Sequence, residues 1–134
     1  MWHEPICDRT EKDIAVGSPK SFCNAADLNR LEDNCREVAA LLGIAILVRN
    51  TPWSAADFPT VSELARIIAN VRLLDERYMA YQTTPPPPEN PLNHWQKWND
   101  AEKILLDIHK SRQEHMAALL HCGEMKMGER IGVI

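Results

Sequence analysis

Residues 24–43 decide the fold class, and they read NAADLNRLEDNCREVAALLG. Asn24 is a residue type that accepts hydrogen bonds from the free amides at a helix N-terminus. Gly43 suits the left-handed conformation that ends many helices. Between them, apolar side chains recur at spacings of three and four, which places them on one helical face: Leu28, Leu31, Cys35, Val38 and Leu42. The stretch therefore predicts a helix over residues 25–42.

Two later segments keep the same period. Thr60 and Glu63 have the spacing of a capping box, and the apolar positions after them predict a helix over 60–82. A third helix is predicted over 92–121, with Trp95 and Trp98 in the core and Gly123 ending it. The charged residues between the apolar positions are expected on solvent-exposed faces, among them Arg30, Glu32, Glu102 and Asp107.

The segments outside these helices differ in character. Residues 1–22 have no sustained apolar period and predict an N-terminal arm, in which Asp8 or Thr10 starts one helical turn. Trp2 and Phe22 are its candidate contacts with another subunit, and packing of the arm on its own domain is an equal alternative. Pro85 to Pro88 predict a rigid polyproline connector that carries the chain back along the bundle. From this connector we expect a third helix antiparallel to the second.

A small β element is expected beside the helices. Residues 44–49 begin with Ile-Ala-Ile-Leu-Val, which predicts a short buried strand, although continuation of the first helix through Gly43 is the alternative. Ile131, Val133 and Ile134 form the other β-prone segment, and we expect them to pair within the domain or with a neighbouring subunit. The predicted fold is thus mainly α: a three-helix bundle over residues 23–134 with an N-terminal arm and a small β element.

Composition narrows the possible functions. The 134 residues suit one domain, and a net charge of -4 gives no field that would gather nucleic acid. No apolar run has the length of a membrane span, and without an export signal we expect synthesis in the cytoplasm. No catalytic, cofactor or metal-binding motif is present, so we expect neither an enzyme nor a cofactor. The alternative is a thiol- or metal-dependent module or regulator that uses His121 and Cys122 with a distant ligand.

Several strings of residues resemble small tail and baseplate proteins of phages and prophages of Gram-positive bacteria. They are Asp8-Arg9-Thr10, the stretch from Phe22 to Glu32, Trp53 through Asp57 with Pro59 and Thr60, Asn99 through Leu105, and the ending Cys122-Gly123-Glu124 with Met127-Gly128-Glu129. Their order along the chain matches that family. The segment between the Asp-Arg-Thr turn and Asn24 is shorter than in the family.

The resemblance implies a virion structural protein without an activity of its own. It implies a multi-copy component or adaptor that is made in the host cytoplasm and assembled into the virion tail. Its expected partners are other tail or baseplate proteins and copies of itself. The resemblance supplies no set of functional residues to carry over.

Overall fold

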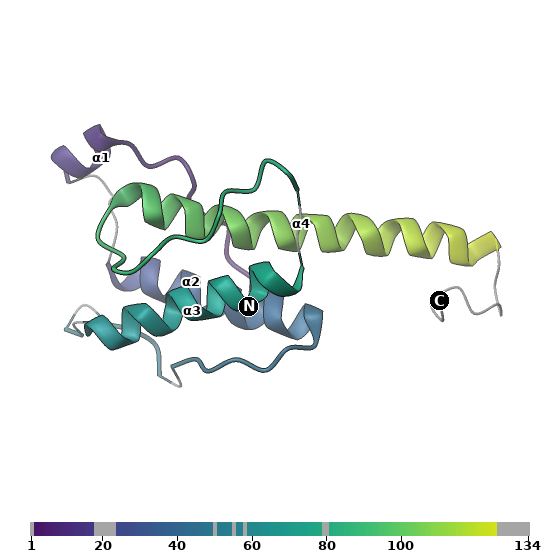
Figure 1. Cartoon of the computed structure of the whole chain (residues 1–134), viewed down its shortest axis with the longest axis horizontal. Coiled ribbons are helices and arrows are strands. Elements are labelled where there is room, and N and C mark those ends of the chain that lie inside the picture. The colour runs from purple at the N-terminus through teal and green to yellow at the C-terminus, as the bar shows by residue number, and fades with distance from the viewer. Residues whose placement is uncertain are drawn as a thin grey trace.

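The computed structural model describes residues 2–17, 24–49, 51–54, 56–57, 59–78 and 81–125, and these ranges are mainly helical. The helices are α1 (Glu11–Ala15), α2 (Ala25–Leu42), α3 (Val61–Arg77) and α4 (Trp95–Met125), as Figure 1 shows. The mainly α class is therefore confirmed. The predicted contacts Phe22, Ile131, Val133 and Ile134 lie outside the described residues.

Local signals start and end the helices. Thr10, Asn24 and Thr60 each form a complete capping box at the start of α1, α2 and α3. Gly43 ends α2 with a φ of 69°, so the predicted bounds of this helix are confirmed and its continuation through Gly43 is excluded. Helix α3 ends at Arg77, five residues short of the predicted limit at 82, and the extended backbone of Tyr78 follows it.

Helix α4 begins later and ends later than predicted. It starts at Trp95 and continues through Gly123 to Met125, so Gly123 is not its stop. Glycine permits a left-handed end but does not impose one, and its cost inside a helix is only about 1 kcal/mol relative to alanine.

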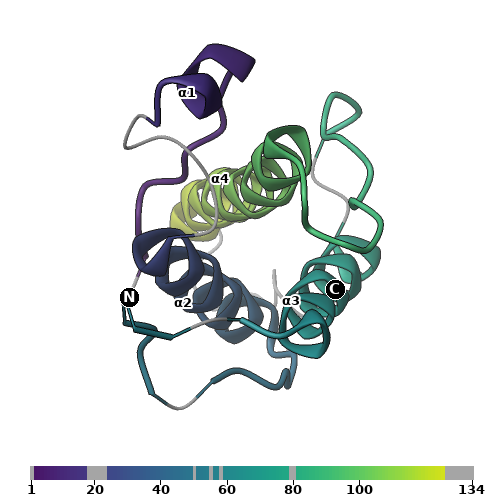
Figure 2. The ribbon, with the colours of Figure 1, turned by 90° about the vertical axis from the view of Figure 1, so that its left-hand side faces the viewer.

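The three long helices run parallel to one another. Arg30 of α2 donates to Glu102 of α4. The end of α3 lies beside a later part of α4, where the Tyr78 hydroxyl is 3.3 Å from that of Ser111. Figure 1 shows the three helices pointing the same way, and Figure 2 shows them as a triangle seen end-on. The expected antiparallel arrangement of the last two helices is therefore wrong.

Two long connectors make this order possible, because each returns along the bundle before the next helix starts. The connector after α2 begins beside Ala39, passes Glu32 at Arg49 and reaches Asn29 at Trp53. The connector after α3 moves back toward the start of α4. Tyr81 contacts Glu114, Thr84 then contacts Asp107, and Leu92 finally contacts Trp98. The tetraproline lies in the second connector and does carry the chain back, as expected. Short loops join antiparallel helices, whereas connectors of bundle length allow parallel ones.

The predicted strand over residues 44–49 is not formed within the described part of the chain. The segment is extended, but side chains satisfy part of its backbone: Arg66 and Asn70 of α3 donate to the Leu47 carbonyl, and Glu32 of α2 accepts from the Arg49 amide. Helices on both sides thus supply bonds that a neighbouring strand would otherwise provide.

The core lies along the axis between the three helices. Its buried apolar residues come from α2, α3, α4 and the two connectors, and include Leu31, Val38, Trp53, Ile68, Val71, Leu92, Trp98, Ile104 and Ile108. Trp98 is completely buried and its indole donates to the Leu92 carbonyl, whereas Trp95 is only half-buried. Of the two tryptophans expected in the core, one is therefore there.

Candidate functional site

A cluster of four charged side chains is buried where the N-terminal segment meets α2 and α4. It consists of Arg9, Asp27, Arg30 and Glu102, with two positive and two negative groups. Arg9, Asp27 and Glu102 are almost completely buried. The prediction that Glu102 lies on a solvent-exposed face is wrong, because Arg9 covers its carboxylate.

Arg9 connects the N-terminal segment to both helices. Its Nη2 donates to Glu102 Oε2 at 2.6 Å and to Asp27 Oδ1 at 3.1 Å. Its Nη1 donates to the Asn99 amide oxygen and to the Ile6 carbonyl, so the guanidinium also fixes the backbone of residues 6–9. The Asn99 amide nitrogen donates in return to the Arg9 carbonyl at 3.0 Å. The N-terminal segment is therefore anchored on the body of its own chain.

Arg30 closes the cluster from the solvent side. Its Nε and Nη2 donate to the two carboxylate oxygens of Glu102, and Nη2 also donates to Asp27. Burial alone lowers the pKa of Arg30, but the hydrogen bonds and charges of Glu102 and Asp27 outweigh burial and raise it above its usual value. The cluster pairs two guanidinium groups with two carboxylates, so its formal charges balance.

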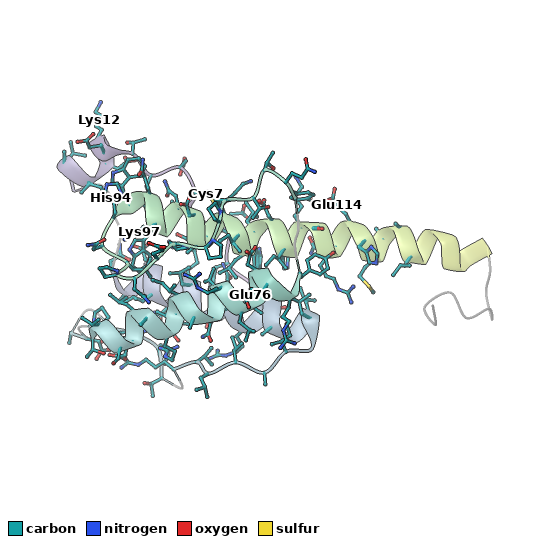
Figure 3. The ribbon with its side chains drawn as sticks, viewed as in Figure 1. Cys7, Lys12, Glu76, His94, Lys97 and Glu114 are labelled. Atoms are coloured by element: carbon teal, nitrogen blue, oxygen red, sulfur yellow. The ribbon has the colours of Figure 1, made fainter. Side chains whose placement is uncertain are left out.

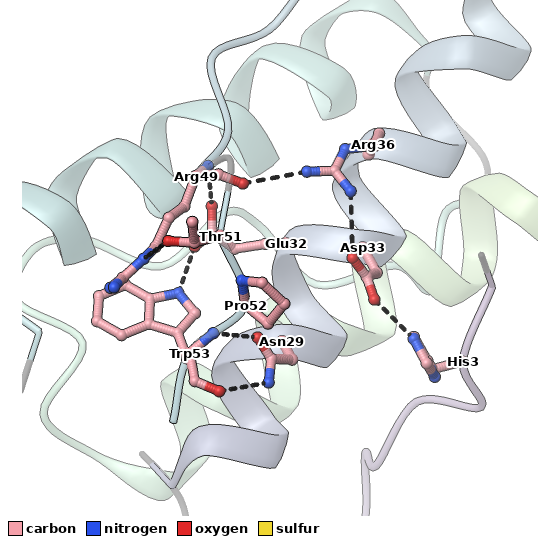
Figure 4. Close-up of a pocket in the computed structure, with 9 residues that line it drawn as sticks. All are labelled: His3, Asn29, Glu32, Asp33, Arg36, Arg49, Thr51, Pro52 and Trp53. Atoms are coloured by element: carbon pink, nitrogen blue, oxygen red, sulfur yellow. Dashed lines mark hydrogen bonds and ion pairs between the residues drawn. The ribbon is translucent and has the colours of Figure 1, made fainter. Parts of the chain in front are cut away.

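A second polar site lies beside the first connector, in a pocket of about 280 Å³ (Figure 4). Trp53 forms its inner wall: its backbone exchanges two hydrogen bonds with the Asn29 side chain, and its indole donates to Glu32. The Arg49 guanidinium covers the Trp53 ring at 3.9 Å from the centroid. At the outer edge, His3 and Arg36 both contact Asp33.

Glu32 is the buried charge of this pocket and was also predicted to be exposed. Burial alone raises the pKa of Glu32, but hydrogen bonds from Arg66, the Arg49 amide and the Trp53 indole outweigh it and hold the pKa below its usual value of 4.5. Its carboxylate accepts from Arg66 at 2.7 Å. The charges of this site hold the first connector against α2 and α3, as those of the first cluster hold the N-terminal segment.

Neither described cysteine is an activated thiol. Burial raises the pKa of Cys35 to about 12 and that of Cys7, which lies against α4 (Figure 3), to about 11. Both are therefore protonated at neutral pH, and the thiolate is the nucleophilic form. Within the described ranges, no three His, Cys, Asp or Glu side chains are grouped so that they could hold a metal ion. These residues give no support to the thiol- or metal-dependent alternative, whose His121 and Cys122 have no described side chains.

Trp2 is the one predicted contact residue whose side chain the structure describes. Its ring stacks on His109 of α4, with centroids 3.7 Å apart and planes 7° from parallel. Burial lowers the pKa of His109 below its usual 6.5, which favours the neutral form of the stacked imidazole. Trp2 thus lies on its own chain, half-buried, with part of its surface still accessible.

Comparisons with known proteins found no match among family models, curated proteins or solved structures. No helix in the described part of the chain is both long and apolar enough to cross a membrane.

The two polar networks were missed, although the sequence carries a signal for them. Glu102 stands four residues after Trp98 and three before Leu105, and Glu32 stands four after Leu28 and three before Cys35. Both carboxylates therefore interrupt an apolar stripe, where a charge is rare unless it is paired. The signal shows that a partner is needed, but not that Arg9 or Trp53 supplies it.

Proposed function

We propose that the protein is a virion structural protein, a multi-copy component or adaptor of a phage-like tail or baseplate that acts through contacts between subunits. The observation that carries this proposal is the position of the residues behind the resemblance. Arg9, Asp27, Arg30 and Glu102 come from three of the matching strings and form one buried cluster. Asn29 and Glu32 come from the same strings and hold Trp53, which belongs to a fourth.

This agreement supports the proposal because it ties the likeness to the residues that hold the fold together. A likeness on exposed helix faces would follow from helical composition alone. Strings far apart in sequence have instead the complementary charges that a shared architecture requires. We therefore take the resemblance to be one of architecture.

The shape of the molecule supports a role in contacts. Arg30 donates to Glu102, and the charge of Glu37 acts on His109, so α2 and α4 advance together and α2 ends near the level of residue 115. The last ten residues of α4 extend beyond that level by about 15 Å (Figure 1). Met116, on this extension, is 41% exposed. Residues 113–118 of α4 are exposed, so this part of the helix is suited to packing against another chain.

The test is the composition of particles from the bacterium that encodes the chain. Prophage induction, density-gradient purification and quantitative mass spectrometry would measure copies of this chain per particle. We expect a fixed, repeated copy number in tails and density for the bundle in electron micrographs. A matched strain carrying Arg9→Met, which breaks the buried cluster, is expected to lose the chain from its particles. Intact tails that lack the wild-type chain would contradict the proposal.

A further inference from the structure

We propose that the extended segment 44–48, defined here as the acceptor segment, binds residues 131–134 of a second copy of this chain as an added β-strand. The inference rests on the proposed function, since it names the contact through which copies would meet. Three features support it: the free backbone of the acceptor segment, an apolar groove beside it, and its distance from the end of α4.

The backbone of the acceptor segment is only partly used. The Ile44 amide donates to Ala39 and the Leu47 carbonyl accepts from Arg66 and Asn70. Within the described part of the chain, the amides of residues 45–48 and the carbonyls of 45, 46 and 48 have no hydrogen-bond partner. An extended stretch with such free groups is a template for strand addition.

The side chains of this segment alternate as in a strand with one buried face. Ile44 and Ile46 pack against the core, whereas Ala45 and Leu47 are exposed, Leu47 to 77%. A groove of about 400 Å³ lies between the segment and α3, with Ile46, Leu47, Ala69 and Leu73 among its apolar lining. The groove gives apolar side chains of an added strand a place beside the free backbone.

Residues 131–134 are the sequence of this chain that fits such a groove. They read Ile-Gly-Val-Ile, so three of four are β-branched apolar residues without a charge. In an extended strand Ile131 and Val133 share one face, and Gly132 between them allows close approach of the other backbone.

The chain's own tail is too short to place this segment there. The acceptor segment lies across α2 and α3 from α4 (Figures 1 and 2). From Met125 the chain must return about 15 Å along the bundle and cross roughly 15 Å of packed helices. The straight line from Met125 to the acceptor segment is therefore about 21 Å, and a path around the surface is longer. The six residues from Met125 to Ile131 span about 20 Å when fully extended. The donor is therefore another copy.

The experiment measures binding of a fluorescent peptide with residues 126–134 to a chain lacking residues 131–134, by fluorescence anisotropy. We expect saturable binding that Leu47→Asp weakens at least tenfold. Val61→Asp is the matched control, because Val61 is also 77% exposed but does not line the groove, and it should change the affinity less than twofold. A peptide with Val133→Asp should not bind. Circular dichroism of each chain variant checks that it is folded.

Light scattering of the full chain then identifies the donor. Association that increases with concentration and is lost on deletion of 131–134 supports the inference. A full chain that stays monomeric and excludes the peptide would show that its own tail fills the groove, and would overturn the inference. So would a peptide that does not bind, or one that binds the Leu47→Asp chain equally well. Particle composition is measured independently, so a chain present in tails whose peptide fails to bind refutes only this inference.

Discussion

Replacement of Arg9 by methionine tests whether the buried cluster holds the N-terminal segment on the bundle. Methionine keeps an apolar stem of similar length but removes the charge. The remaining groups are Asp27 and Glu102, which are both buried, and Arg30, so the cluster acquires a net charge of about -1 in a dry site. Breaking a buried ion pair in this way costs about 3–5 kcal/mol. Out of a total stability of roughly 5–15 kcal/mol, this loss lowers the melting temperature by about 10–20 °C.

Urea unfolding followed by circular dichroism measures the free energy of unfolding for both proteins. Arg36→Met is the control, because Arg36 is 48% exposed and pairs only at the surface, so its loss should cost less than about 1 kcal/mol. A loss for Arg9→Met equal to that of the control would refute the reasoning.

A second variant separates charge balance from simple loss of contacts. Glu102→Gln in the Arg9→Met background leaves one carboxylate, Asp27, facing one guanidinium, Arg30. We therefore expect the double variant to be more stable than Arg9→Met alone, with a coupling energy of about 1–3 kcal/mol. Losses that simply add would show that the four groups do not act as one network.

Three further outcomes follow from single residues. The pKa of Glu32 is lowered in the folded state, so its contribution to the free energy of unfolding is complete above its usual pKa of 4.5 and is lost as pH falls through the folded pKa. Glu32→Gln should therefore reduce the difference in the urea-measured free energy of unfolding between pH 7 and pH 3. Gly43→Ala should destabilise by about 1–2 kcal/mol, because alanine is strained at a φ of 69° although no atom crowds the position, and Gly43→Asn should cost less in the same assay. Cys35 should resist iodoacetamide in the native protein and react after unfolding, as read by peptide mass spectrometry; rapid native labelling would contradict its burial and its pKa of about 12.

The parts of the fold that depend on neighbours in sequence were predictable. The bounds of α2 follow from Asn24, Gly43 and the apolar spacing between them, and all of these signals lie within 20 residues. The capping box at Thr60 likewise located the start of α3. Such signals act over one or two helical turns and do not depend on which other elements surround the helix.

The parts of the fold that depend on partners far away in sequence were not predictable. Glu102 is buried because Arg9, 93 residues away, covers it, and Glu32 because Trp53 and Arg66 do. The relative direction of the helices is decided by two connectors whose length the sequence shows but whose course along α2 and α4 it does not. The expected strand at 44–49 failed for the same reason, since Arg66 and Asn70 of α3 take over part of its backbone bonding.

The parallel order of the helices also restricts how copies can associate. All three long helices begin at one end of the bundle and α4 alone extends past the other (Figure 1), so the two ends are chemically different. The proposed donor segment follows the extended end of α4, whereas the acceptor segment lies on the opposite side of α2 and α3. A contact between them joins two different surfaces, so it closes a two-fold dimer when two copies exchange donors and otherwise gives a larger ring or an open filament. The geometry of this single contact would determine which of these assemblies forms.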